Sequence, residues 1–517
     1  MLTSISRGQH TRQALFIGLL FVPIFALMFL AGFFAGRSNE VIFPIAVAVA
    51  IMSIIGLLVT MGLNWRLGLY AIFYFVLWDR LTAFGETGNM SMTKVCIGLT
   101  VIFLFTAIFN NQLPGWYRRL ADPLALLSFL YVAMAFASLA VARFPAEYGL
   151  EYVQRRFFIA VLLCMIIVAV KDRETFHRCV LALVIGGTMV AIATTSEAIT
   201  GVGLLERLGR SNPERGSGLN TLQSYGGRFR LVGPSGDPPF YSLAQSLPGV
   251  LVFALLFYYR EWWKKALLFV ALGFIVFNIM GTGSRAGALA FAAGATMVFV
   301  LCPIKHRLSK AILFAAVGYL ALTALVVLDT GVAADRIASP GEASRTMTYR
   351  TAMWQMAVDM WTDNPLVGVG TNGWFVYYHD YRIPGASPEF LRTHNAFLQL
   401  LAENGPIGVA VYLLINLFAI VSAFCAALAT HDRRLKFEAM AFAACTVGFF
   451  LFAGSSNVLE NELYFLVFGM CGASYHVYKS ERLRPESVGD DRVEYAPKWR
   501  RLTFLKHRQN QMFPPGT

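Results

Sequence analysis

Long apolar runs recur throughout this chain of 517 residues and constrain its fold more than any other feature. A helix needs about 20 mostly apolar residues to cross a bilayer, and about fourteen segments approach that length. Only 14% of the residues are charged, against about 25% in an ordinary soluble domain, which excludes a water-soluble fold. The sequence predicts an all-α, polytopic transmembrane helical bundle with about 12–14 spans. The predicted spans are 14–36, 41–62, 66–84, 92–109, 121–142, 153–170, 178–200, 240–259, 264–283, 286–303, 310–329, 406–428, 437–456 and 461–478.

Two long loops and a polar tail complete the predicted organisation. We expect an integral membrane domain over 1–480, with long extracytoplasmic loops at about 201–239 and 330–405. Loops of this length are usually functional or disordered. Because these two contain tryptophan, tyrosine and apolar residues, we expect them to fold over the bundle and to contain short helices. The basic tail, 481–517, is polar and is expected to be mostly disordered.

The positions of the basic residues predict how the chain crosses the membrane. Lysine and arginine are enriched in cytoplasmic loops, and here every second loop is basic. This places both termini in the cytoplasm. It also explains the net charge of +13 without any need for nucleic acid as a partner. The basic positions assigned to the cytoplasmic side are Arg66, Arg118, Arg119, Lys171, Arg173, Arg260, Lys264, Lys265, Lys305, Arg307, Lys310, Arg433, Arg434, Lys436 and the tail from Lys479 to Arg508.

The two basic residue types divide unequally between the two sides. Every lysine except Lys94 falls on the predicted inner side, whereas about sixteen arginines fall on the outer side. Guanidinium presents a planar pair of donors that fits phosphate or carboxylate, which ammonium does not. This favours an anionic ligand outside. The alternative is that single outer arginines pair with loop acids such as Glu206, Glu214 and Glu342.

Two outer segments bring arginines to the membrane boundary. In NIMGTGSRAGALA, Arg285 stands between two predicted spans, where an ionisable residue is a functional candidate. Its alternative role is snorkelling to lipid headgroups. The first long loop ends in GGRFRLVGPSGDPPFYS, which supplies Arg230 and Asp237 before the next span.

The second long loop contains a predicted helix, TMTYRTAMWQMAVDMWTDNP. Arg350, Trp354, Ala357 and Trp361 fall on one face at helical spacing. The two tryptophans suit a membrane interface, and a purely interfacial helix is the alternative reading. The presence of Arg350 among these aromatic residues favours a role in which it faces a lipid headgroup.

Two motifs follow this helix. GVGTNG fits the dinucleotide pattern, but no strand precedes it and it lies on the outer side, so we expect a tight turn and no cofactor. RTHNAFLQLLAENGPIG then predicts a short helix that ends at Asn404-Gly405-Pro406, with His394 and Asn395 at its start. A histidine there has an ordinary pKa suited to a general base. The alternative is that His394 only caps the helix.

Three of these stretches together resemble the O-antigen ligase and O-antigen polymerase family: GTGSRAGALA, YRTAMWQMAVDMWTDNPLVGVGTNGWF and THNAFLQLLAENGPIG. The family-like segment extends over about 230–460. The resemblance implies that Arg230, Arg285 and Arg350 bind a lipid diphosphate, that Arg285 also takes part in catalysis, and that His394 is the catalytic base. Asp237, Asn395 and Trp354 are possible supporting residues. One departure is Asp237-Pro238-Pro239, where the family often has an Asp/Asn-Pro-Asn element.

The resemblance also implies a reaction and a location. A glycan would move, with inversion, from a polyprenyl diphosphate to an acceptor sugar hydroxyl on the periplasmic face of a bacterial inner membrane. The outer loops have no Asp-x-Asp signature, so we expect no metal. The expected partners are the lipid-linked donor, a glycan or lipid-linked acceptor, the bilayer and other polysaccharide-assembly proteins.

Several alternatives remain open from the sequence. The shared motifs do not separate a repeat-unit polymerase from a ligase. A transporter or flippase for a lipid-linked glycan or other solute is a second class, although such carriers usually place ionisable residues near the bilayer midplane. A non-catalytic assembly subunit, with the outer loops as docking surfaces, is a third.

Overall fold

The computed structural model describes residues 64–78, 92–200, 222–225, 228–301, 318, 340–386 and 391–482. The spans expected at 14–36 and 41–62, nearly all of the one at 310–329, and the tail beyond 482 lie outside the described residues. Within the described part, helices dominate, and the only sheet has two strands. The prediction of an all-α polytopic bundle is therefore confirmed.

Eight of the described helices are long and apolar enough to cross a membrane, and two shorter apolar helices accompany them. The eight are α4 (Met92–Phe109), α6 (Pro123–Ala140), α7 (Glu147–Ala169), α8 (Arg173–Thr200), α10 (Pro238–Tyr258), α11 (Trp262–Gly281), α17 (Ala396–Ala429) and α18 (Arg433–Ala453). The shorter apolar segments are α3 (Arg66–Phe75), which continues as the 3-10 turn η1 (Val76–Trp78), and α12 (Arg285–Leu301). The remaining helices are α5 (Trp116–Leu120), the 3-10 turn η3 (Gly233–Ser235), α15 (Pro340–Asp363), α16 (Gly373–Tyr377) and α19 (Glu462–Arg482).

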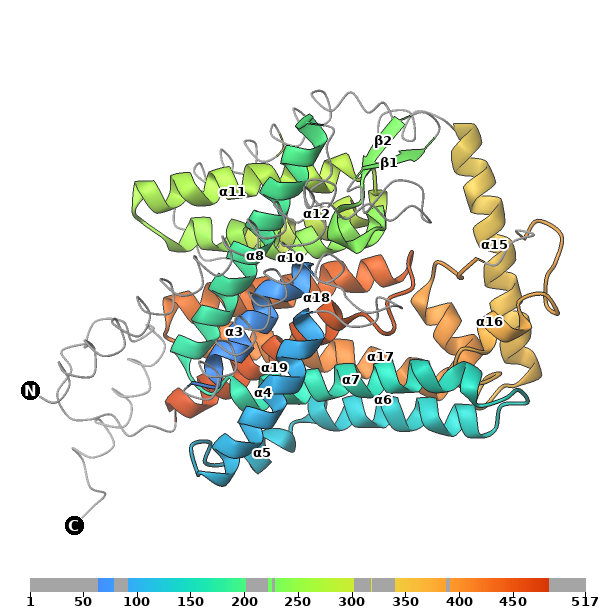
Figure 1. Ribbon diagram of the computed structural model, residues 1–517, viewed down its shortest axis with the longest axis horizontal. Helices are drawn as coiled ribbons and strands as arrows, with labels where there is room; N and C mark the ends of the chain where they lie inside the picture. The colour runs from blue at the N-terminus through green and yellow to red at the C-terminus, as the bar shows by residue number, and fades with distance from the viewer. Residues whose placement is uncertain are drawn as a thin grey trace, which may run out of the picture. The chain divides into compact units, whose positions relative to one another are not determined.

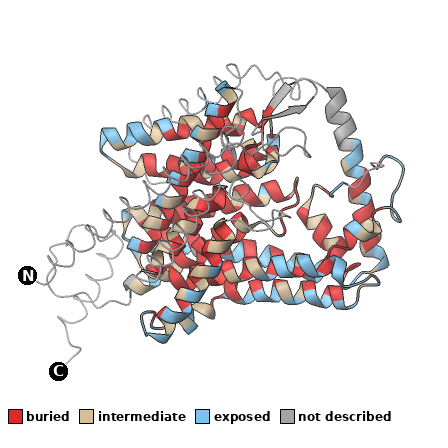
Figure 2. Ribbon diagram, in the orientation of Figure 1, coloured by how far each residue is buried: buried red, intermediate tan, exposed pale blue. Residues whose placement is uncertain are grey.

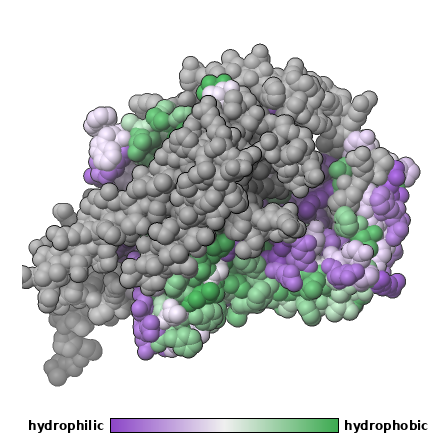
Figure 3. Space-filling model, in the orientation of Figure 1, coloured by the Kyte–Doolittle hydropathy of each residue, from purple (hydrophilic) through white to green (hydrophobic). Residues whose placement is uncertain are grey.

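Helices α10, α12 and α18 pack against one another at the centre of the bundle. Nearly every side chain of α10 and α18 is buried, whereas α4, α6 and α11 bury only one side (Figure 2). Their other sides expose large apolar residues such as Phe105, Phe136 and Leu267. An exposed apolar surface of this kind is expected where lipid is the solvent. In Figure 3, green surface follows the lower flank, where α6 lies, and purple surface gathers around α15 and α16.

The start of α7 differs from its prediction. The span was expected at 153–170, but the helix already begins at Glu147. Glu147 and Glu151 lie in its first turns and hide this part of the helix from a search for apolar runs. Arg156, further along the helix, is fully buried.

The first long loop contains a β-hairpin that the sequence analysis did not predict. Strands β1 (Leu222–Tyr225) and β2 (Arg228–Leu231) pair antiparallel, with Gln223 opposite Arg230. Gly226-Gly227 stands between the strands in the sequence. Two glycines between short strand-like segments are a hairpin signal, and the prediction of short helices alone overlooked it. Strand β2 contacts α10 and α11.

The second long loop has a core of its own. Helix α15 buries Met353, Met356, Ala357 and Met360, and Trp374 of α16 joins them. Trp354 and Trp361 flank this face and are only partly buried. The apolar side of α15 is thus covered by its own loop and by the start of α17.

The loops divide between two ends of the bundle (Figure 1). We call one the α5 end: it contains α5, the starts of α3, α6, α8 and α18, and the part of α19 around His476. Contacts such as Arg66–Asp172, Arg173–Asp432 and His476–Asp122 tie these parts together. We call the other the α15 end: it contains the β-hairpin, α15, α16 and the residues leading into α17. The contacts at the α5 end include basic residues that the sequence assigned to one side of the membrane, namely Arg66, Arg119, Lys171, Arg173 and Arg433.

Candidate active site

A break in α17 anchors the second long loop to the bundle. The backbone turns at Gly405, whose φ is 66°, and Pro406 has no N–H to donate to the carbonyl of Ala402. That carbonyl instead accepts from Val369 N at 2.8 Å, and the carbonyl of Glu403 accepts from Gly370 N at 3.1 Å. The predicted helix end at Asn404-Gly405-Pro406 is therefore present as a kink.

The GVGTNG motif supplies these two amides. Gly368 has a φ of 70°, and a Cβ there would lie 2.4 Å from the Ala402 carbonyl oxygen. Glycine is needed so that this backbone can approach α17 closely. The motif thus acts as a backbone contact between the loop and the kinked helix.

His394 lies in the short segment that leads into α17. Its φ of 51° is in the left-handed region, which is uncommon for residues other than glycine. Asn395, not His394, is the N-cap, since its side-chain oxygen accepts from Phe397 N and Leu398 N. The reading of His394 as the helix cap is therefore wrong, and Asn395 supports the segment by capping.

Trp354 holds the residue before the histidine. Its indole Nε1 donates to the carbonyl oxygen of Thr393 at 3.1 Å. The tryptophan comes from α15, so this hydrogen bond links the helix of the second long loop to the His394 segment. Trp354 therefore has a specific polar contact in addition to its place beside the loop core.

Arg230 and Arg285 meet at the turn between α11 and α12. Arg230 is buried, and its Nε donates to the carbonyl of Thr282 at 2.8 Å. Gly283, with a φ of 61°, and the Thr282 hydroxyl, which accepts from Ser284 N, shape the turn. Arg285 then begins α12 with an exposed side chain. Asp237 occupies the N-cap position of α10, but its side chain does not cap that helix.

Arg350 interacts electrostatically with both Arg285 and His394. Burial and the charge of Arg285 lower the pKa of Arg350. Burial, Arg350 and Arg392 lower the pKa of His394 to about 4. Like charges that interact in this way repel one another, and a bound anion would relieve the repulsion. The structure therefore brings three of the predicted site residues together, with Arg230 bound to the same α11–α12 turn.

No described carboxylate forms an ion pair with Arg285, Arg350 or His394. The Nε of Arg350 is buried without a hydrogen-bond partner among the described residues. A neutral imidazole beside guanidinium groups can accept a proton while the arginines bind an anion. The described residues contain no group of histidine, cysteine, aspartate and glutamate that could hold a metal ion.

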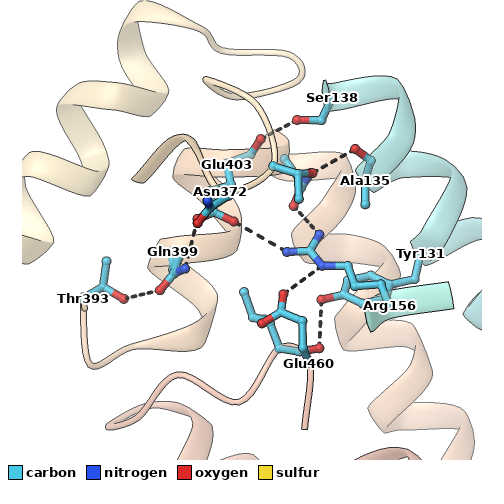
Figure 4. A network of polar contacts seen from close by, with 12 residues as sticks. Tyr131, Ala135, Ser138, Arg156, Asn372, Thr393, Gln399, Glu403 and Glu460 are labelled. Atoms are coloured by element: carbon cyan, nitrogen blue, oxygen red, sulfur yellow. Dashed lines mark hydrogen bonds and ion pairs between the residues drawn. The ribbon is translucent and has the colours of Figure 1, made fainter. Parts of the chain in front are cut away.

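Two features of the site were missed from the sequence. Arg392 lies two residues before His394 and influences its charge, although only the histidine was singled out. Arg156 forms a buried network with Glu403 and Glu460 (Figure 4). The signal for Arg156 was present, because an arginine inside a predicted span is by default a functional candidate.

The described helices and this group of residues define a polytopic membrane protein with a cationic site at one end of its bundle. Residues 270–413 match the sequence model of a family described as O-antigen ligase, which is the family that the sequence motifs resemble. The matched range contains Arg285, Arg350 and His394. It supports a function in membrane glycan transfer of the O-antigen ligase or polymerase type. No individual curated protein matched the sequence.

Proposed function

We propose that the protein transfers a glycan from a polyprenyl diphosphate donor to an acceptor sugar hydroxyl on the periplasmic face of a bacterial inner membrane. The observation that carries this proposal is the grouping of Arg285 and Arg350 beside His394 without a carboxylate partner among the described residues. Guanidinium groups suit a diphosphate, and the match to the O-antigen ligase family supports a lipid-linked glycan as the source.

The reaction needs little beyond charge neutralisation and a base. The diphosphate leaves the anomeric carbon as the acceptor oxygen forms its new bond, and His394 takes the hydroxyl proton. Arg230, Arg285 and Arg350 stabilise the negative charge that develops on the leaving group. Direct displacement inverts the anomeric centre, and these cations make a metal ion unnecessary in the proposed mechanism.

His394 is suited to this task by its protonation state. Its lowered pKa of about 4 keeps the imidazole neutral at neutral pH, so it is ready to accept a proton. The charge of the bound diphosphate would offset that of Arg350 and Arg392, which raises the pKa again. The base therefore becomes stronger once the donor is present.

Both a repeat-unit polymerase and a ligase fit this mechanism. They differ only in the acceptor, which is a second lipid-linked glycan in one case and another carrier in the other. Other polysaccharide-assembly proteins are the proposed partners in the membrane. Both termini are proposed to lie in the cytoplasm, with the α5 end facing it.

The test compares His394→Ala and Arg285→Ala with His379→Ala in cells that lack the wild-type protein. His379 is an exposed histidine of the same loop. We expect both site variants to insert normally, to make no product glycan and to accumulate the lipid-linked donor at the outer leaflet. The His379 variant should restore the product. Full product formation by both site variants would reject the enzyme, and a donor confined to the inner leaflet would favour a flippase instead.

A further inference from the structure

We propose that Thr393 and Gln399 are positioning residues, which hold His394 in place by connecting its segment to the buried ion network around Arg156. This inference rests on the proposed role of His394 as the base. It extends that role to a set of residues reaching from the α15 end into the bundle. No part of the network touches the diphosphate site directly in the described contacts.

The anchor of this connection is a fully buried guanidinium. Arg156 of α7 donates from Nε to Glu460 at 3.0 Å and from an Nη to the side-chain oxygen of Asn404 at 2.7 Å. Its other Nη lies 3.5 Å from the Glu403 carboxylate. Its charge also lies 4.9 Å from the ring of Tyr131. Removal of one partner from such a pair would leave an uncompensated buried charge, so this cluster resists rearrangement.

The hydrogen bonds continue from Glu403 to the histidine segment (Figure 4). The Nε2 of Gln399 donates to Glu403 at 2.9 Å. The hydroxyl of Thr393 lies 3.3 Å from the side-chain oxygen of Gln399, within donating distance. The same hydroxyl accepts from Asn395 N at 3.3 Å and lies 3.0 Å from the Asn395 carbonyl. These contacts hold Thr393 and Asn395, the residues on either side of His394.

The backbone conformation of His394 explains why its neighbours need to be held in place. A left-handed φ of 51° is unfavourable for a side chain with a Cβ, and it persists only when the surroundings enforce it. Thr393 is fixed through its hydroxyl by Gln399 and through its carbonyl by Trp354. Asn395 is fixed by the helix that it caps. Loss of the Thr393 hydroxyl would therefore let the segment relax.

A relaxed segment has a measurable consequence at the imidazole. The charged groups that act on His394 are Arg350 from α15 and Arg392 from its own segment, while Arg285 from α12 acts on Arg350. All are cations, and with burial they lower the pKa of His394 to about 4. If the ring gains water and moves from these groups, its pKa rises towards the ordinary value of about 6.5.

The experiment measures this pKa directly on the full chain in lipid nanodiscs. Diethyl pyrocarbonate modifies neutral but not protonated imidazole, and mass spectrometry of the peptide that contains His394 gives the modification rate at each pH. Thr393→Val removes the hydroxyl at nearly constant shape, and Thr393→Ser retains it. Gln399→Met removes the bridge to Glu403. Asn416→Leu removes another buried amide from α17, far along the helix from the His394 segment.

We expect the midpoint of modification to rise by about one pH unit or more in Thr393→Val and Gln399→Met, towards the ordinary histidine value. It should stay at the wild-type value in Thr393→Ser and Asn416→Leu. Wild-type midpoints in both bridge-breaking variants would overturn the proposal, and so would an equal shift in the serine variant. If one bridge-breaking variant fails to fold, the other decides. The measurement needs no substrate, so its outcome is separate from the activity of His394→Ala.

Discussion

Three arginines at the α5 end and two at the α15 end differ in their partners. At the α5 end, Arg66, Arg173 and Arg434 each contact a carboxylate, at 3.2, 3.1 and 2.8 Å. At the α15 end, Arg285 and Arg350 form no ion pair with a described carboxylate and instead influence each other. The first arrangement neutralises charge within the protein. The second leaves like charges together for a ligand to neutralise.

This difference distinguishes arginines that stabilise the fold from arginines that are candidates for binding or catalysis. A paired cation stabilises the fold, and its removal strands the partner, at greatest cost where that partner is buried like Glu438. A cation beside another cation slightly opposes folding, so a contribution to stability does not explain why it is present. Groups with perturbed charge that gather in this way are candidates for binding or catalysis. Matched substitutions at the two ends can test the distinction.

Among these matched substitutions, the largest effect is expected from Arg350→Gln. Removal of a donor that stabilises developing charge typically slows catalysis by about 100- to 1000-fold. Folding should not suffer, because Arg350 has an unpartnered buried Nε among the described contacts and faces Arg285. We expect glycan transfer to fall by that factor, while the unfolding temperature in nanodiscs is unchanged or higher. A strong loss of thermal stability would show that Arg350 is a structural residue.

Arg434→Gln should produce the opposite pattern at the α5 end. Its Nε donates to Glu438, which is buried and also contacts His177. We expect the variant to lose about 1–3 kcal/mol of stability, as for a buried acceptor that loses a charged donor. Transfer per folded molecule should remain at the wild-type rate. A large loss of turnover with normal stability would contradict the inference that arginines at the α5 end contribute to stability and not to transfer.

Arg285→Lys should have a smaller effect than Arg350→Gln. Lysine keeps the positive charge but lacks the planar fork that binds two phosphate oxygens. A loss of one such hydrogen bond corresponds to about tenfold in transfer rate, since each 1.4 kcal/mol is a factor of about ten. Arg173→Lys at the α5 end should transfer glycan normally. Full activity of Arg285→Lys would mean that charge alone, and not geometry, selects arginine at this end.

The sequence predicted the parts of the fold that depend on apolar length. Segments such as 92–109 and 264–283 became α4 and α11 because lipid requires long apolar helices. The helix break at Gly405-Pro406 was also predictable, because proline and glycine act locally. The start of α7 at Glu147 was not, because Glu147 and Glu151 interrupt the apolar run. The burial of Arg156 was not predictable either, because its partners Glu403 and Glu460 are distant in the sequence.

The candidate site was predicted as a set of residues but not as an arrangement. Arg285, Arg350 and His394 were selected because each lay at a membrane boundary or in a motif. Their mutual influence depends on where α12, α15 and the His394 segment meet, which no local pattern specifies. Asn395 shows the limit at short range, because either residue of the His394-Asn395 pair could have capped α17.

The last prediction concerns pH and compares the site with and without its ligand. In the proposed mechanism neutral His394 is the active form, so the rate should fall as pH drops through its pKa. In the free protein that pKa is lowered to about 4 by burial, Arg350 and Arg392, and kcat/KM should hold until the pH approaches this value. In the donor complex, the diphosphate offsets the two arginines, so the acid limb of kcat should lie about one unit higher. Both limbs can be measured with donor purified from the host strain. If the acid limbs of kcat and kcat/KM coincide, the charge of the diphosphate does not affect the pKa of His394. The cations of the α15 end would then need another ligand.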